Sequence, residues 1–109
     1  MSYDIRFGVK VEGYDGYAVI GEPEYASPTY NVGEILRKCM AWDFEQSTWY
    51  KVKDYIPNIE KGIHEMKFNA KKYKSLEPDN GWGSTDSVLK CLQSIMEYIT
   101  EKIQWSWNG

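Results

Sequence analysis

The side chains that most often bind metal ions or act as nucleophiles are scarce in this sequence, which has one histidine and two cysteines. On a helix His64 would share a face with Glu60, four residues before it, but two ligands do not make a zinc site. Cys39 and Cys91 lie in apolar helical patterns, where a thiol is buried and keeps its proton. We therefore expect free thiols, no metal site and no Cys–His catalytic pair.

Carboxylates that could serve acid–base catalysis are concentrated near the amino terminus. They are Asp4, Glu12, Asp15, Glu22 and Glu24. Acid–base catalysis needs groups held at a defined separation, and nothing in the spacing of these five selects a pair. We interpret them as solvent-facing side chains. The sequence thus predicts a protein that is not an enzyme, with no catalytic residues and no cofactor.

A glycine-rich turn precedes the last predicted helix, and the free N–H groups at a helix start can hold an anion. The turn is Asn80-Gly81-Trp82-Gly83-Ser84. A Walker-type phosphate loop would continue with lysine, whereas here Asp86 follows and would repel phosphate. We interpret the segment as a turn and helix cap, with Trp82 buried.

The cluster Lys71-Lys72-Tyr73-Lys74 places an aromatic ring among three cations, so that a base could stack on Tyr73. Residues 51–74 hold seven lysines against three acids, but the whole chain has a net charge of −3 and a pI of about 5.1. Nucleic-acid binders usually carry a broader basic surface. Nucleic acid is therefore an alternative and not the favoured partner.

The composition is that of one globular domain over residues 1–109. A hydrophobic fraction of 42% excludes intrinsic disorder. Five tryptophans and nine tyrosines are more than a small core can enclose, so some aromatic rings should be exposed at an interface. We find no secretory signal and no apolar run of the ~18 residues that span a membrane, which predicts a cytoplasmic protein without membrane contact.

Alternating apolar side chains predict a strand over residues 3–11 with one buried face. That face would hold Tyr3, Ile5, Phe7, Val9 and Val11. Turn residues follow at 13–16, so residues 17–20 complete a hairpin. Residues 25–30 could add a third, short strand, which Pro28 would limit to an edge or to its start.

Helical periodicity begins after this sheet. Asn31 is a suitable N-cap for a first helix over residues 32–41. Residues 42–50 have neither helical nor strand periodicity and are expected to be a connection. Asp54 is the expected N-cap of the second helix, which places Pro57 in the first turn, where its missing N–H costs nothing.

The last helix has the strongest periodic pattern, and Ser84 or Thr85 caps its start. Its inward residues step by three or four positions. They are Val88, Leu92, Ile95, Ile99 and Ile103. The order of elements predicts an α+β fold: a small antiparallel sheet of two to three amino-terminal strands packed against about three helices.

Four short strings stand out by their order and spacing along most of the chain. They are Met1-Ser2-Tyr3-Asp4-Ile5, Thr29-Tyr30-Asn31-Val32-Gly33, Ile56-Pro57-x-Ile59-x-Lys61-Gly62 and Asn80-Gly81-Trp82-Gly83. Together they resemble a family of small uncharacterised proteins encoded in bacteriophage and prophage genomes. The resemblance implies an accessory protein that blocks a host process by binding, such as an inhibitor of a CRISPR nuclease or a sponge for an immune signalling nucleotide.

The predicted function is that of a non-catalytic binding module that contacts a host protein and can form a homo-oligomer. Exposed aromatic side chains are the expected contact residues. They are Tyr30, Trp42, Trp49, Tyr50 and Trp105. Two alternatives stay open: a nucleotide held between aromatic rings and helix N-termini, and nucleic acid bound through residues 71–74.

Overall fold

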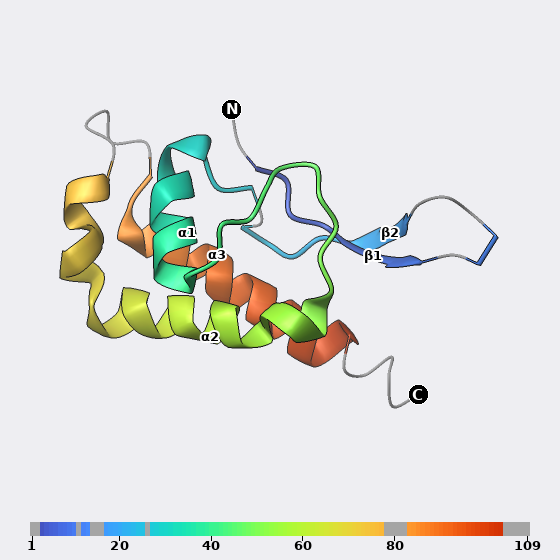
Figure 1. Ribbon diagram of the computed structural model, residues 1–109. Helices are drawn as coiled ribbons and strands as arrows, with labels where there is room; N and C mark the ends of the chain where they lie inside the picture. Colours follow the sequence, from blue (N-terminus) through green and yellow to red (C-terminus); the bar gives the residue numbers. More distant parts are fainter. Residues whose placement is uncertain (1–2, 11, 14–16, 26, 78–82, 104–109) are drawn as a thin grey trace.

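The computed structural model describes residues 3–10, 12–13, 17–25, 27–77 and 83–103, and it confirms the α+β prediction (Figure 1). Two strands, β1 (Phe7–Lys10) and β2 (Tyr17–Gly21), form an antiparallel sheet. Three α-helices follow: α1 (Gly33–Met40), α2 (Val52–Phe68) and α3 (Thr85–Tyr98). Shorter helical turns lie beside them: η1 (Tyr30–Val32), η2 (Ala70–Leu76) and η3 (Ile99–Ile103).

The core lies between the three α-helices, and α2 packs against both α1 and α3 (Figure 1). In α3 and the turn after it, Val88, Leu92, Ile95 and Ile99 are buried as their periodicity predicted. The buried apolar residues of the helices and helical turns include Val32, Ile35, Leu36, Cys39, Met40, Ile59, Met66, Val88, Cys91, Leu92, Ile95 and Ile99. Among the described helices, none is both long enough and apolar enough to cross a membrane.

The first two helices start at different residues from those predicted. Asn31 lies inside η1, and the capping side chain is Thr29, which accepts a hydrogen bond from the N–H of Asn31 at 3.4 Å. The second helix starts at Val52, two residues before the predicted N-cap Asp54. The N–H of Asp54 donates a hydrogen bond to the carbonyl of Lys51 at 3.1 Å, so Asp54 already lies within the first helical turn. Pro57 therefore lies in the second helical turn, where its missing N–H removes one bond near the helix start.

The start of α3 agrees with the prediction. The hydroxyl of Ser84 accepts a hydrogen bond from the N–H of Ser87 at 3.2 Å, and the hydroxyl of Ser87 accepts one from the N–H of Ser84 at 2.9 Å. This reciprocal pair is a capping box, and Asp86 adds a favourable charge in the first turn. The expected burial of Trp82 concerns a position outside the described residues.

The hairpin of β1 and β2 projects from one end of the helices instead of lying flat against them (Figure 1). Phe7 is buried, and its ring stacks on Tyr98 of α3 with centroids 4.8 Å apart. Val9, two residues further along the same face, is 47% exposed. The predicted buried face is therefore wrong at Val9, because no helix reaches that part of the hairpin (Figure 1), and Val11 lies outside the described residues.

The predicted third strand over residues 25–30 is not formed in the described part of that segment. Tyr25 has a positive φ of 56°, which interrupts an extended backbone. The carbonyl of Pro28 accepts a hydrogen bond from the N–H of Tyr3 at 2.8 Å, so this segment still holds the start of the chain. The sheet thus has two strands, the lower of the two predicted numbers.

Gly62 allows close packing of α2 on its neighbours and gives a first test of the core. A Cβ atom there would lie 2.8 Å from Cδ1 of Leu92 and 2.8 Å from Cγ of Met40. We expect Gly62→Val to lower the free energy of unfolding by about 1–3 kcal/mol through overpacking, measured by urea denaturation. Lys67→Val, at an exposed position of the same helix, should change it by less than about 0.5 kcal/mol. Equal effects of the two substitutions would contradict this packing.

Candidate functional site

Exposed apolar side chains gather on the projecting hairpin and on the connection beside it. We call this group the hairpin surface; it consists of Val9, Tyr17, Val19, Ile20 and Trp49. By the strand pairing, Tyr17 and Val19 share the face on which Trp49 lies over Gly8, whereas Val9 lies with Ala18 on the other face. Val19 and Ile20 are each 51% exposed, and Trp49 is 45% exposed. Large apolar side chains collected on one element are typical of contact surfaces.

Trp49 lies across one face of the hairpin because Gly8 leaves room for its ring. A Cβ atom at residue 8 would lie 3.0 Å from two ring atoms of Trp49. The ring centroid of Trp49 is 4.8 Å from that of Tyr17, and the ammonium of Lys10 is 5.7 Å from the Tyr17 centroid. This face of the hairpin therefore offers two rings in contact, with a cation beside them.

Trp42 and Tyr50, two of the predicted contact residues, meet in an aromatic cluster that holds the connection between α1 and α2. Trp42 stacks on Tyr55 of α2 with centroids 4.0 Å apart, and Tyr50 meets Trp42 edge to face at 4.9 Å. The hydroxyl of Tyr50 accepts a hydrogen bond from the N–H of Glu45 at 2.7 Å. Both rings are partly buried, so they position Trp49 more than they contact solvent.

Tyr30, a further predicted contact residue, lies on another element. Tyr30 is exposed on η1, where its ring lies 4.5 Å from that of Tyr3, and Trp105 lies outside the described residues. The structure thus brings Trp42 and Tyr50 into direct contact, and Tyr30 reaches Trp42 only through the rings of Tyr3 and Phe44. Sequence reasoning missed the hairpin residues, although the absence of charge from residues 17–21 is a signal that could have pointed to them.

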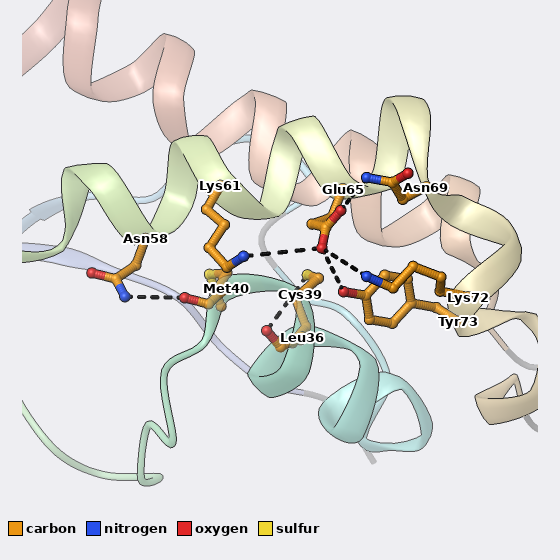
Figure 2. A network of polar contacts seen from close by, with 9 residues as sticks. All are labelled: Leu36, Cys39, Met40, Asn58, Lys61, Glu65, Asn69, Lys72 and Tyr73. Atoms are coloured by element: carbon orange, nitrogen blue, oxygen red, sulfur yellow. Dashed lines mark hydrogen bonds and ion pairs between the residues drawn. The ribbon is translucent and has the colours of Figure 1, made fainter.

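A network of polar side chains surrounds Glu65, whose side chain is only 9% exposed (Figure 2). Asn69 donates a hydrogen bond to one carboxylate oxygen, and the Tyr73 hydroxyl donates to the other at 3.1 Å. The ammonium groups of Lys72 and Lys61 lie 3.5 Å and 4.0 Å away. The hydrogen bond from Asn69, followed by those from Tyr73 and Lys72, holds the pKa of Glu65 below 4.5 although burial opposes this. The network ties η2 to α2.

The same contacts bury the aromatic ring of the predicted nucleic-acid cluster, whereas its lysines, Lys71, Lys72 and Lys74, stay exposed. Tyr73 is only 7% exposed, so its ring is not open to a base in this structure. Burial together with its bond to Glu65 raises the pKa of Tyr73 to about 12. Lys74 pairs with Glu77 at 3.3 Å. The exposed ring at this end of α2 is instead Phe68, 71% exposed, which sequence reasoning did not single out.

The cysteines and the histidine do not meet. Cys39 and Cys91 are free and buried, as predicted, and burial is the main cause that raises the pKa of each thiol to about 12. His64 is exposed and lies 4.9 Å from the ring of Phe68, centroid to centroid. In the described part of the chain, no three His, Cys, Asp or Glu side chains gather into a possible metal site.

Two open hollows mark the surface of the described residues. The first, of about 370 Å³, lies at the start of α3 and is lined by Tyr25, Ser27, Pro28, Thr29, Gly83, Ser87 and Lys90. Its hydroxyls and ammonium could hold an anion. The second, of about 300 Å³, lies beside the base of the hairpin and is lined by Glu22, Pro23, Glu24, Ser94, Glu97, Tyr98 and Glu101. Its four carboxylates give that end of the molecule a negative charge.

The network at Glu65 makes stability depend on pH. Because the pKa of folded Glu65 lies below 4.5, its contribution is full above pH 4.5 and is lost as the pH falls through the lowered pKa. We expect Glu65→Gln to lower the urea midpoint at pH 7 and to weaken the decline of that midpoint as the pH falls below 4.5. Glu60→Gln, at an exposed position of α2, should keep the wild-type decline. A decline in Glu65→Gln as steep as that of the wild type would refute this role.

No protein-family model, no curated protein and no solved structure matches the chain. What the chain does is therefore inferred from its own residues and from the surfaces that they form.

Proposed function

We propose that this chain is a non-catalytic binding module that acts by protein–protein contact through the hairpin surface. The observation that carries the proposal is the projecting hairpin, on which Val9, Val19 and Ile20 are about half exposed and Trp49 lies against Tyr17. A monomeric soluble protein gains nothing from exposing such a group to water. A partner that covers it would remove apolar area from water, at about 25 cal/mol per Å².

The aromatic pair is suited to be the centre of such a contact. Tryptophan and tyrosine dominate binding energies at protein interfaces because they bury a large area and lose little conformational freedom. Trp49 already packs against Tyr17 and over Gly8, and the next residue in the chain, Tyr50, is fixed against Trp42. Less entropy is then lost when a partner binds.

The resemblance to phage-encoded proteins suggests what kind of partner this is. We infer a protein of the infected host cell, reached in its cytoplasm, whose activity is blocked when the hairpin surface covers it. A component of a defence system, such as a CRISPR nuclease, fits this role. The four carboxylates beside the base of the hairpin favour a partner with a basic surface.

Partner capture by immobilised variants tests this function. We expect Trp49→Ala to weaken binding of the captured host protein at least about 30-fold, as loss of a central aromatic usually does. Phe68→Ala removes an even more exposed ring from the opposite end of α2 and should leave capture unchanged. Thermal unfolding would show that both variants fold. Loss of capture in Phe68→Ala with full capture by Trp49→Ala would place the contact elsewhere.

A second candidate function is the sequestration of a nucleotide in the hollow at the start of α3. The observation that favours it is that Lys90, three hydroxyl side chains and the exposed Tyr25 line the same hollow. Phosphate oxygens accept from such donors, and a base can stack on a tyrosine ring.

Thermal-shift measurement with a panel of linear and cyclic nucleotides checks this candidate. A nucleotide present at 100 times its Kd would add about 2.7 kcal/mol to the free energy of unfolding. Lys90→Ala should abolish the shift, whereas Lys53→Ala, at an exposed position of α2, should retain it. A panel that shifts neither the wild type nor Lys53→Ala would eliminate the candidate.

A further inference from the structure

The outer edge of β2 is open and uncharged. Within the described residues β2 pairs only with β1. None of its five residues, Tyr17 to Gly21, is charged or proline, whereas β1 carries Lys10. Lysine and proline on exposed edges are the usual means by which proteins prevent edge-to-edge pairing. This edge therefore keeps its capacity to add another strand.

The hairpin also has less support than two strands need. An isolated two-stranded hairpin is marginally stable in water, and a further strand or a packed helix supplies the missing stability. Phe7 stacks on Tyr98 at the base, and Trp49 covers one face. Val19, which pairs with Gly8, and its neighbour Ile20 nevertheless stay about half exposed. A third strand along β2 would cover the part that the helices leave open.

A second copy of β2 matches this edge. The register shift between Phe7 and Gly8 leaves residues 17–19 as the regularly paired part of β2. Ala18 is the middle residue of this segment. If two copies of the segment pair antiparallel about a two-fold axis, the two Ala18 residues lie opposite each other at the axis. Tyr17 of one copy then lies opposite Val19 of the other. Aromatic and β-branched side chains form favourable cross-strand pairs, and two small alanines meet at the axis.

This pairing also keeps like charges apart. Glu22 follows β2 directly, and with Ala18 on the axis the two Glu22 residues lie roughly 26 Å apart at 3.3 Å of rise per residue. That separation exceeds the Debye length of about 8 Å at physiological salt. The antiparallel arrangement likewise sets the two helical bodies at opposite ends of the joined strands.

We propose that the chain forms a homodimer in which two β2 strands pair antiparallel about an axis at Ala18 and create a four-stranded sheet. Neighbouring antiparallel strands related by this axis present the same face on the same side of the sheet. Tyr17 and Trp49 of both copies would then lie on one face. The dimer needs no other partner and goes beyond the proposed host contact.

A cysteine placed on the axis tests this register. In Ala18→Cys the two Cα atoms would lie about 4.5–5.5 Å apart, within the range of about 4.4–6.8 Å that a disulfide spans. Because Cys39 and Cys91 are buried, the introduced thiol is the one that oxidants reach. We expect mild oxidation to convert most of Ala18→Cys into a linked dimer on a non-reducing gel. Gln93→Cys, at an exposed position of α3, should stay monomeric.

Sedimentation equilibrium of the purified chain gives an independent measurement. The unsubstituted chain should form a dimer, and Ala18→Lys should raise its dissociation constant about fivefold by placing like charges opposite each other. Mixing Ala18→Lys with Ala18→Glu should restore the dimer, and circular dichroism would show that both variants fold. A monomeric unsubstituted chain, together with equal linkage of Ala18→Cys and Gln93→Cys, would overturn the dimer and leave this edge to a strand of another protein. Because the chain is tested alone, this result does not depend on capture of a host protein.

Discussion

The stacking of Phe7 on Tyr98 joins the hairpin to the helices. Such ring pairs contribute about 0.5–1.5 kcal/mol beyond the area they bury. The backbone of Gly21 lies against the same tyrosine, and this approach needs glycine because a Cβ atom there would overlap the Tyr98 hydroxyl. The hairpin is thus fixed at its base while its outer part reaches away from the core. Every exposed group on the hairpin depends on this join for its position relative to α3.

A second join holds the connection between α1 and α2. Trp42 stacks on Tyr55, and Tyr50 packs against Trp42, so a segment without regular secondary structure still has a defined course. Trp49 lies next to Tyr50 in the chain and is carried onto the hairpin by that course. Trp49, which is exposed, and Tyr50, which fixes the connection, are thus adjacent in sequence but differ in role. Half-buried aromatics here stabilise a loop, and the more exposed one is free for contact.

The helices were predictable because residues three or four apart share a face, and one apolar stripe is enough to specify burial. The stripe of Val88, Leu92 and Ile95 is an example. Alternation in a strand tells which side chains share a face, but not whether anything packs on it. Phe7 meets a ring from far along the chain and Val9 does not, and only tertiary structure separates the two.

The same limit applies to the candidate site. Composition predicts that some of the aromatic residues must be exposed, but which ones depends on long-range contacts. Trp42 is covered by Tyr55, and Tyr73 is drawn inward by its hydrogen bond to Glu65. Phe68, by contrast, has the ring of His64 beside it and remains largely exposed. A local pattern of lysines around Tyr73 could not reveal a bond to a carboxylate on the preceding helix.

The distribution of charge along the molecule has a consequence for how fast it meets a partner. The carboxylates Glu22, Glu24, Glu97 and Glu101 lie beside the hairpin, whereas the lysines of residues 67–74 lie at the opposite end of α2 (Figure 1). A molecule with such an electric dipole turns in the field of a charged surface before contact. A basic surface would thus meet the hairpin end first. Encounters would be faster at low ionic strength, where this field reaches further into the solvent.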